Sequence, residues 1–317
     1  MISPLVTFRS FHNSDPPQLV RLWNECELGR GAAEFTENSL EMVNFAQSYF
    51  DQQGLIVAEV DGRVVGMVHA GFSPQDSEVG LDKKRGVICM VMVTPEHRRQ
   101  GIGRALVEQA RVYLQNAGAE SLVIGGAPGA NPFYVGLYGG SQPAGFLDSD
   151  PNAAPFFKAL GFSPQLRHLV FQRDIAQTAD AINFRLMQNR RKYELSIVGG
   201  PETPSWWWMT RFGRLDALSF LLVPKRGGTP VASVTVLGLD LFLAKWQERS
   251  VGLVDLWVSE ELRRQGLGQT LLCEVGRRLR DELVTSMEIH ADENNHALQG
   301  LLNSCGFLQV DAGTVFH

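Results

Sequence analysis

The sequence contains little cysteine, and its four cysteines do not form a close pair. Cys26, Cys89, Cys273 and Cys305 show no Cys-x-x-Cys spacing and sit mostly within apolar patterns. This spacing argues against a disulfide framework and favours buried thiols in a reducing compartment. The histidines likewise show no metal-ligand spacing, so we expect no metal site.

Long apolar runs and an export signal are also missing. No apolar run approaches the length that a helix needs to cross a bilayer, so we expect no membrane association. The N-terminus lacks a charged start followed by an apolar core, which is the pattern of a secretory signal. We therefore expect a cytoplasmic protein.

Positive charge is not in excess either. The formal net charge is −5, so the composition does not indicate broad attraction to nucleic acid or to an anionic membrane. The 317 residues are 44% apolar and 20% charged, as in a soluble globular protein. This length favours two domains of about 150 residues each.

The chain does contain one stretch that occurs twice. Residues 93–103 (VTPEHRRQGIG) return as residues 258–268 (VSEELRRQGLG), and the offset is constant because 258 − 93 and 268 − 103 both equal 165. In each copy an apolar run precedes the stretch, and apolar residues at helical spacing follow it. Each copy therefore predicts a strand, an arginine-rich turn with two glycines, and a helix.

This unit is suited to binding an anion. The first backbone N–H groups of a helix have no intrahelical partners, and the peptide dipoles place partial positive charge there. Glycines in the turn leave room for a diphosphate to reach those N–H groups, and the paired arginines add positive charge. The alternative is an ordinary tight turn that packs a helix onto a sheet. Neither copy contains the glycine pattern of a dinucleotide fold or of a nucleoside-triphosphate loop.

The turn also resembles a known motif. Arg-x-x-Gly-x-Gly after a strand that ends in valine is similar to the acyl-CoA signature of the GNAT superfamily of N-acetyltransferases. The matching residues are Arg98, Gly101 and Gly103 in the first copy and Arg263, Gly266 and Gly268 in the second. Each copy is followed by an amphipathic segment that ends in Gly-Phe. The resemblance covers nearly all of the first half and roughly residues 215–307 of the second.

The resemblance implies a mixed α/β (α+β) fold with two GNAT-like domains, each a central twisted mixed β-sheet flanked by helices. We place these domains at residues 1–174 and 175–317, the second with an abbreviated front end. It also implies that acetyl-CoA binds on one turn or on both. The implied contacts are Val91, Val93, Arg98, Arg99, Gln100, Gly101, Ile102, Gly103 and Arg104 in the first copy, and Trp257, Val258, Arg263, Arg264, Gln265, Gly266, Leu267, Gly268, Gln269 and Asn295 in the second. For Asn295 a helix cap is the simpler interpretation.

Two local patterns predict secondary structure outside the repeat. Asp61-Gly62 between two β-branched runs predicts a hairpin in the first half. Residues 176–193 at the start of the second half look helical.

The first half also carries an insert. Gly101 to Gly161 spans 60 residues and Gly266 to Gly306 spans 40, so the difference is about 20 residues, which we place at 125–150. This segment is rich in glycine and aromatic residues and nearly uncharged, so we expect it to be ordered. The aromatic residues Phe133, Tyr134 and Tyr138 either line an acceptor pocket or fill space.

A catalytic base is easier to nominate in the second half. Asp255 lies inside an otherwise apolar strand, where a carboxylate is costly unless paired or hydrated. The matching first-copy residue is Met90, because 255 − 165 = 90. The resemblance implies a base or water-relay carboxylate on this strand, so Asp255 is our candidate; alternatively it faces solvent or pairs with an arginine. Glu59 and His69 are weaker candidates in the first half.

The usual catalytic acid is missing. The family's tyrosine sits four residues before the glycine of Gly-Phe, and these positions hold Phe157 and Leu302. A general acid contributes roughly 10² to 10⁴ in rate, whereas positioning the reactants supplies about 7–11 kcal/mol. The loss therefore argues for a slower or differently equipped enzyme but does not exclude catalysis.

We therefore expect an acetyl-CoA-dependent N-acetyltransferase that acts by direct transfer on a primary amine of a small molecule or peptide. We expect one active half, and Asp255 favours the second. The alternative is a non-catalytic acyl-CoA-binding or sensing protein, which would fit the absence of the tyrosine from both halves.

Overall fold

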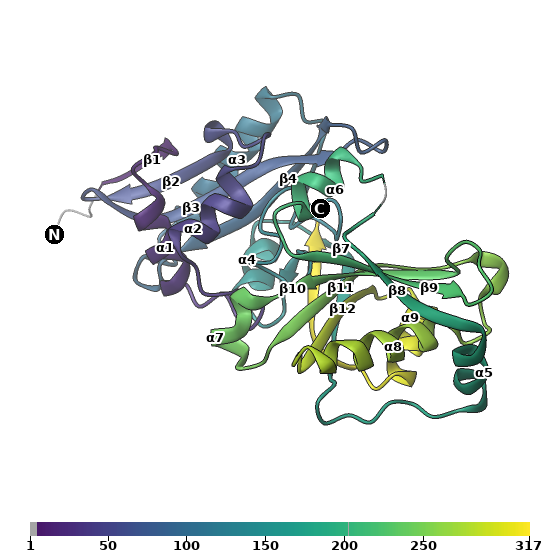
Figure 1. The fold of residues 1–317 in the computed structure, drawn as a ribbon. Coiled ribbons are helices and arrows are strands. Elements are labelled where there is room, and N and C mark those ends of the chain that lie inside the picture. Colours follow the sequence, from purple (N-terminus) through teal and green to yellow (C-terminus); the bar gives the residue numbers. More distant parts are fainter. Residues whose placement is uncertain (1–4, 202) are drawn as a thin grey trace. The chain divides into compact units, whose positions relative to one another are not determined.

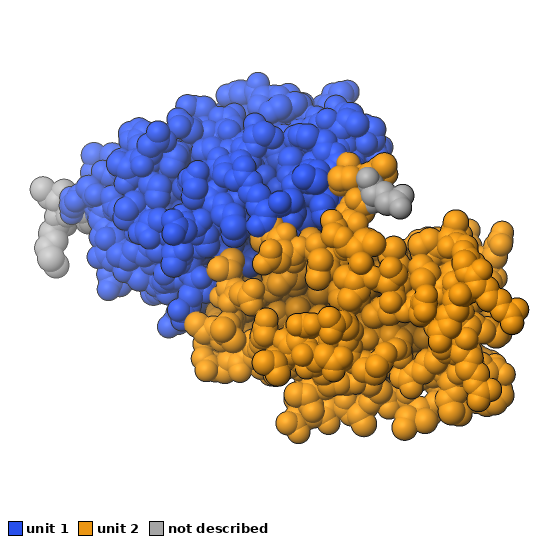
Figure 2. All heavy atoms as spheres, in the orientation of Figure 1, with its two compact units in different colours: residues 1–167, 205–214, 313–317 blue, residues 168–204, 215–312 orange. Residues whose placement is uncertain are grey.

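The structure, a computed structural model, describes residues 5–201 and 203–317. Figure 2 shows that these residues form two units. Unit 1 is the described chain up to Arg167 with Ser205–Arg214 and Gly313–His317; unit 2 is the described part of His168–Pro204 with Leu215–Ala312. The expected division after residue 174 follows the repeated sequence and stays a prediction. The units themselves are not separated by a single cut, because two short segments of the second half belong to unit 1.

Unit 1 contains a mixed sheet with helices (Figure 1). Its elements are β1 (Val6–Ser10), α1 (Pro16–Glu25), α2 (Glu37–Leu40), a π-helical turn (Glu41–Phe45), a 3₁₀ turn (Gln52–Gly54), β2 (Leu55–Val60), β3 (Arg63–Pro74), β4 (Leu81–Val93), a 3₁₀ turn (Pro95–His97), α3 (Ile102–Asn116), β5 (Ser121–Ile124), β6 (Phe146–Leu147), α4 (Ala153–Ala159) and α6 (Trp206–Phe212).

In the sheet of unit 1, β1 to β4 pair in chain order as antiparallel neighbours, and β4 pairs with β5 in parallel. The β2–β3 turn confirms the predicted hairpin, since Asp61 and Gly62 have φ angles of 50° and 78°. Gly66 on β3 faces Leu106 of α3, whereas Gly71 faces Phe133 of the insert. These glycines are five positions apart on one strand, so α3 and the insert cover opposite faces of the sheet.

Unit 2 repeats this plan. Its elements are β7 (Pro164–Asp174), α5 (Phe184–Lys192), β8 (Tyr193–Val198), β9 (Ala217–Pro224), β10 (Ala232–Gly238), a 3₁₀ turn (Asp240–Phe242), α7 (Leu243–Trp246), β11 (Ser250–Val258), a 3₁₀ turn (Glu260–Leu262), α8 (Leu267–Asp281), β12 (Ser286–Asp292), α9 (His296–Ser304) and β13 (Leu308–Phe316). The first residues of β7 and the last residues of β13 lie in unit 1.

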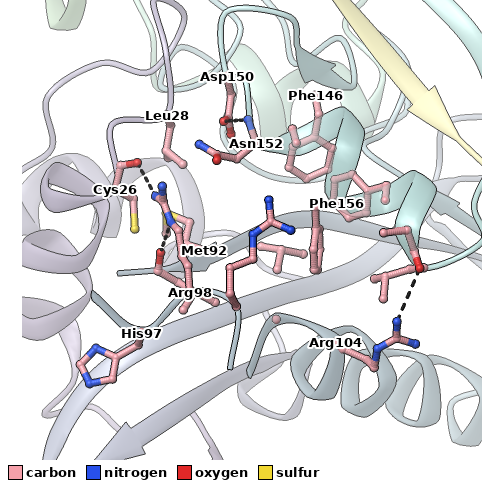
Figure 3. A pocket seen from close by; sticks show the side chains of 18 of the residues that line it. Cys26, Leu28, Met92, His97, Arg98, Arg104, Phe146, Asp150, Asn152 and Phe156 are labelled. Carbon is pink, nitrogen blue, oxygen red and sulfur yellow. Dashed lines mark hydrogen bonds between the residues drawn. The ribbon is translucent and has the colours of Figure 1, made fainter. Parts of the chain in front are cut away.

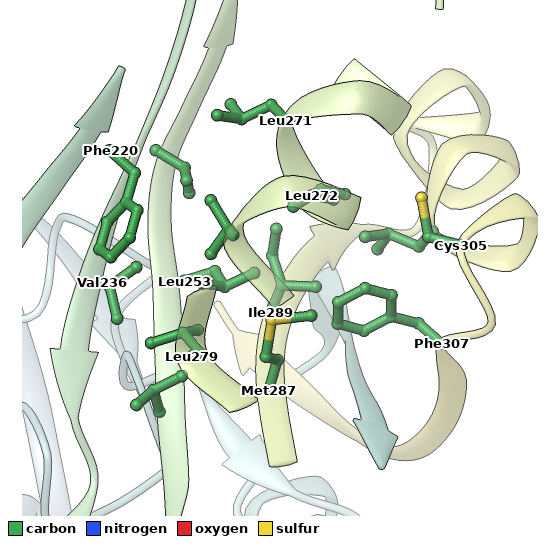
Figure 4. Packing of buried hydrophobic residues seen from close by; sticks show 14 of the residues in the cluster. Phe220, Val236, Leu253, Leu271, Leu272, Leu279, Met287, Ile289, Cys305 and Phe307 are labelled. Carbon is green, nitrogen blue, oxygen red and sulfur yellow. The ribbon is translucent and has the colours of Figure 1, made fainter. Parts of the chain in front are cut away.

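The sheet of unit 2 has the order β7-β12-β11-β10-β9-β8. Only its β11–β12 pair is parallel. Leu267, Leu271, Val275 and Leu279 recur every four residues on α8, and all four are buried in the apolar cluster drawn in Figure 4. This spacing puts them on one side of the helix and packs α8 onto the sheet. Both units thus have the expected mixed α/β architecture.

One predicted helix is mostly wrong. Residues 176–193 were expected to be helical, but α5 begins only at Phe184. Asn183 caps it, because its Oδ1 accepts a hydrogen bond from the Leu186 backbone N–H at 2.9 Å. Tyr193 already belongs to β8, which pairs with β9. The segment before Asn183 is irregular and makes its hydrogen bonds with side chains of unit 2 instead.

Candidate functional site

A cavity of about 300 Å³ lies in unit 1 beside the first arginine-rich turn (Figure 3). The structure brings most of the predicted first-copy contacts together here: the lining includes Val91, Val93, Arg98, Arg99, Gly101, Gly103 and Arg104. Gln100 is exposed and donates to the Glu96 carbonyl, and Ile102 is buried. The turn, the end of β4 and the start of α4 therefore face one common space.

Gly101 opens the room in front of α3. It is the N-cap of this helix and has a φ of 85°, a left-handed conformation that favours glycine. A Cβ added at Gly101 would meet no described atom within 4 Å. The first N–H groups of α3 follow directly and have no partners within the helix. This geometry fits an anion bound at a helix N-terminus.

Gly103 has a different role. A Cβ added there would come within 3.0 Å of the Phe156 ring on α4, and one added at Gly268 would come within 2.9 Å of Leu301 on α9. The second glycine of each motif therefore lets the last helix of the copy pack closely. In the first copy, only the first glycine of the motif leaves open space for a ligand.

Arg98 ties the turn to its surroundings. Its Nε donates to the Val93 carbonyl at 3.0 Å and its Nη2 to the Cys26 carbonyl at 2.9 Å (Figure 3). Arg263 repeats the first contact with the Val258 carbonyl at 3.3 Å. Each arginine thus fixes the turn against the preceding strand, and Arg98 also brings its charge to the cavity wall.

The end of β4 presents a free backbone edge to the cavity. Its pairing with β5 stops at Ile88, opposite Ile124. Its pairing with β3 continues to Val93, with a bulge where Cys89 interrupts the register. The last residues of β4 therefore have a β3 partner but no β5 partner in the described sheet. Such an edge can bind an extended ligand arm through its backbone.

The second turn has the same backbone conformation as the first. Gly266 has a φ of 80°, and Arg264 has a φ of 64° where Arg99 has 61°. Its surroundings differ, because α5 lies against it. A Cβ added at Gly266 would meet the Cβ of Arg185 at 3.5 Å and the Nδ2 of Asn189 at 3.6 Å. The space that is open at Gly101 is bordered by α5 at van der Waals distance at Gly266.

Hydrogen bonds hold α5 in this position. Asn189 donates from Nδ2 to the Gln265 carbonyl at 3.2 Å and to Thr270 Oγ1 at 3.0 Å. Asn183 donates to the Gln269 side chain at 2.9 Å. These contacts engage the turn itself and the first turn of α8. The sequence did not predict them.

Other predicted second-copy contacts are dispersed. Trp257 is 45% exposed, Leu267 is buried in the apolar cluster, and Arg264 accepts a hydrogen bond from Arg185 through its carbonyl. Asn295 caps α9, because its Oδ1 accepts from the Leu298 N–H at 3.0 Å. The observed contact of Asn295 is therefore that of a helix cap, as the simpler interpretation expected.

The candidate base Asp255 is exposed at a bulge of β11. Its φ is 55°, and the register with β10 shifts at this point. The carboxylate therefore reaches the surface, although its neighbours Val254 and Leu256 on the strand are apolar. Phe157 lines the cavity with 1% of its surface exposed, and Leu302 is fully buried, so neither position supplies a hydroxyl.

The weaker candidates in unit 1 have structural partners. Glu59 forms an ion pair with Arg9 at 3.0 Å. His69 is fully buried, and its Nδ1 lies 3.0 Å from the Tyr134 hydroxyl. Burial lowers the pKa of His69 to about 3. Neither residue lines the cavity.

The insert is packed rather than open. Phe133, Tyr134 and Tyr138 are at most 2% exposed, so these three fill space. The Tyr134 backbone N–H donates to Asn44 Oδ1 at 3.2 Å, and the Tyr138 hydroxyl accepts from the Leu147 N–H at 3.0 Å. The part of the insert that reaches the cavity is its end, through Phe146 and Asp150.

Several lining residues were not predicted from the sequence. They are Cys26, Leu28, His97, Phe146, Asp150, Asn152 and Phe156. Cys26 follows α1, and burial raises the pKa of its thiol to about 11, so it is a neutral group in this wall. The residues at the start of α4 could have been found from their constant distance to Gly-Phe. The residues after α1 carry no such signal.

Both turns lie within stretches of the chain that match a known protein family. A model described as the acetyltransferase (GNAT) family matches residues 17–139 and 186–307. These stretches contain both turns and more than half of the chain. The chain belongs to the GNAT acetyltransferase family. Members of this family generally use acetyl-CoA as the acyl donor.

Two curated relatives match part of the chain. Mycothiol acetyltransferase of Propionibacterium freudenreichii is 29% identical over 153 residues, which are 46% of this chain and 45% of the relative. Human N-acetyltransferase 8 is 35% identical over 86 residues, which are 26% of this chain and 37% of the relative. The matched stretch thus spans less than half of either relative.

Solved structures share the tandem fold. A GCN5-related glucosamine N-acetyltransferase region of a fungal β-N-acetylglucosaminidase aligns with a TM-score of 0.73 and 16% identity over 100% of this chain and 38% of that chain. A tandem GNAT protein from clavulanic acid biosynthesis aligns with a TM-score of 0.67 and 19% identity over 98% of both chains. At these identities the likeness concerns the fold.

None of the described helices is long and apolar enough to cross a bilayer. Residues 5–201 and 203–317 also contain no group of three or more His, Cys, Asp or Glu side chains placed to hold a metal ion.

Proposed function

We propose that this protein transfers the acetyl group of acetyl-CoA to a primary amine of a small molecule or peptide, and that the first half binds the donor. The observation that supports this choice is the contrast between the two turns. Both have the same backbone conformation, but the space at Gly101 is open, whereas α5 borders and restricts the space at Gly266. A diphosphate needs that space to reach the helix N–H groups.

The residues present fit the donor. The N–H groups at the start of α3 would bind the diphosphate, with Arg98 and Arg99 close by, and the free edge of β4 would bind the pantetheine arm. Acetyl-CoA would supply a thioester whose carbonyl carbon an amine can attack. Backbone N–H groups near the β4 bulge would stabilise the developing oxyanion. In that attack a C–N bond would form, the C–S bond would break with CoA leaving as its thiolate, and the proton lost by the amine would pass to solvent or to a base.

The test compares matched glycine variants. Gly101→Phe fills the open space and should weaken CoA binding by about 100-fold or more, or about 2.7 kcal/mol. Gly266→Phe is made in the same backbone conformation, but α5 already restricts its space, so CoA affinity should not change. Calorimetry should give one CoA per wild-type chain. Two CoA per chain, or loss of binding only in Gly266→Phe, would contradict the proposal.

The role of Asp255 as a base stays a prediction that depends on a donor in the second half. Asp255→Asn keeps the shape of the side chain and removes its basicity. If the donor is bound by the first half, turnover should stay near the wild-type value while Gly101→Phe abolishes it. A loss of roughly 100-fold in Asp255→Asn with unchanged CoA affinity would place the chemistry in the second half.

The second candidate function is acyl-CoA binding without catalysis. Phe157 stands where the family's tyrosine would be, and the buried insert fills the face of the sheet opposite α3. Turnover on a panel of amines, measured as free CoA released, separates the two functions. Binding of acetyl-CoA with no amine-dependent release of CoA would favour the sensor.

A further inference from the structure

Two cysteines of unit 2 lie side by side although 32 residues separate them (305 − 273). Cys273 is on α8 and Cys305 follows α9, and their thiols are in hydrogen-bond contact. Their exposed fractions are 0% and 2%. Figure 4 shows Cys305 in the same cluster as Leu272, the residue before Cys273.

A buried guanidinium stands beside this pair. The Arg173 side chain is 0% exposed, and its Nη2 pairs with Asp180 at 2.7 Å. Its Nε and Nη1 are also buried but have no hydrogen-bond partner among the described residues. Nη1 lies 3.7 Å from a Cβ added at Gly276, and Nε lies 3.8 Å from one added at Gly306.

The positions of these two glycines show that the unpaired Arg173 nitrogens lie next to the thiols. Gly276 is one helical turn after Cys273, and Gly306 directly follows Cys305. Buried charged N–H groups without an acceptor are costly. A sulfur anion at Cys273 would lie close enough to compensate this charge.

Other contacts also stabilise an anion at Cys273. The hydrogen bond from the Cys305 thiol is the largest cause that lowers the pKa of Cys273, and Arg173 and the Ala181 N–H lower it as well. The same contact with Cys273 raises the pKa of Cys305. One thiol is thus prepared to be the nucleophile, and its neighbour stays protonated.

We propose that Cys273 and Cys305 are a redox-active dithiol that a small peroxide converts reversibly into a disulfide. The Cys273 thiolate attacks one oxygen of hydrogen peroxide, the O–O bond breaks, and hydroxide leaves and takes up a proton to become water. The Cys305 sulfur then attacks the resulting sulfenic acid. The S–S bond forms, the S–O bond breaks, and the hydroxyl leaves as a second water with the Cys305 proton.

The irregular segment 176–183 covers the pair. Its Ala181 N–H contacts Cys273, and its Thr178 and Ala179 carbonyls accept from Arg173 at 3.3 Å. Neighbouring residues of the segment, such as Gln177 and Ile182, are exposed. Because this cover has no helix or strand hydrogen bonds of its own, its local opening gives a small oxidant access.

The disulfide would also join two helices near the second turn. Gln269, one turn before Cys273 on α8, donates to the Ser304 carbonyl at 3.0 Å, and Ser304 directly precedes Cys305. Oxidation would therefore clamp α8 to α9. This inference does not depend on which half binds CoA.

The experiment treats the full, reduced chain with hydrogen peroxide and identifies cross-linked peptides by mass spectrometry. The expected product is one Cys273–Cys305 disulfide, with the loss of two hydrogen atoms, that dithiothreitol reverses. Cys89→Ser is the control and should react like the wild type, because Cys89 belongs to unit 1 and the proposed pair to unit 2. Cys273→Ser and Cys305→Ser should each abolish the cross-link.

Variants of the surroundings test the geometry. Arg173→Gln should slow disulfide formation roughly tenfold, which corresponds to one pKa unit of the attacking thiol, and Arg173→Lys should retain more of the rate. Ala181→Pro removes the N–H donor and should slow the reaction, whereas Ala181→Gly retains it. Folding is checked by circular dichroism. No Cys273–Cys305 link in the wild type, or wild-type rates in folded Arg173→Gln and Ala181→Pro, would overturn the proposal.

Discussion

Residues of the same type have different structural roles in this protein, and the role of each one is visible only from its surroundings. Gly101 leaves open space at a helix N-terminus, whereas Gly103, two positions later, permits contact with Phe156. Histidines show the same contrast. His69 is enclosed by aromatic rings, including a stacked Phe133 at 4.0 Å between centroids. Its burial has a measurable consequence for stability.

Replacing His69 by Gln should change how the stability of the protein depends on pH. Burial lowers the pKa of His69 to about 3, whereas a free histidine titrates near 6.5. Between these values the unfolded chain binds a proton that the folded chain does not, so the free energy of unfolding falls as pH falls. His69→Gln should reduce this slope by up to about 1.4 kcal/mol per pH unit between roughly pH 6 and pH 4.

Denaturant unfolding of both proteins at several pH values measures this difference. The window ends near pH 4, because carboxylates such as Asp15 and Asp180 begin to titrate below it. Burial raises the pKa values of these two carboxyls, but their ion pairs with Arg9, Arg173 and Arg280 outweigh burial and lower them. Parallel curves for wild type and variant would contradict this prediction, because they would show that His69 takes up its proton in the folded state as well as in the unfolded state.

At the scale of elements, short-range signals predicted most of the architecture. The Asp61-Gly62 hairpin and the strand–turn–helix units are present as expected. The failure at 176–193 has a physical cause. Asp180 in this segment pairs with Arg173 at 2.7 Å and with Arg280, and these tertiary contacts hold residues 176–183 outside any helix. Only the part after Asn183 forms α5.

Replacing Asn189 by Ala should destabilise unit 2 without creating a second CoA site. The variant leaves the Gln265 carbonyl without its 3.2 Å contact and removes one partner of Thr270. The expected loss is about 1–3 kcal/mol in the free energy of unfolding. Gln188→Ala on the same helix changes an exposed side chain and should have an effect within about 0.5 kcal/mol. Urea unfolding and CoA calorimetry measure the two effects; equal stabilities of the two variants would contradict the role of Asn189.

At the scale of the whole molecule, the two units do not coincide with the two halves of the sequence. The last residues of β13 lie in unit 1, where Phe316 pairs with Ile124 of β5 and Thr314 pairs with Phe146 of β6. Phe316 is fully buried, and its ring lies 5.4 Å from that of Phe157. The C-terminal residues therefore support the wall of the cavity beside the first turn.

Phe316→Ala should destabilise unit 1 although the residue belongs to the second repeat by sequence. Removing a fully buried phenylalanine costs about 3–5 kcal/mol. Leu308→Ala is the control, because Leu308 is 72% exposed at the start of the same strand. Amide exchange should rise in β5 and α4 for Phe316→Ala only. Unchanged protection in these elements would show that they do not depend on the C-terminal residues.

The sequence by itself determined the family, the repeated unit and the conformation of both turns. Gly101 and Gly266 have φ angles of 85° and 80°, because local sterics and the adjacent strand and helix control these dihedrals in both copies. Only the tertiary structure decided which turn is open, since the contact from Asn189 to the Gln265 carbonyl joins residues 76 positions apart. Turns with the same backbone conformation thus differ in the space around them, because segments distant in sequence pack beside one turn and not beside the other.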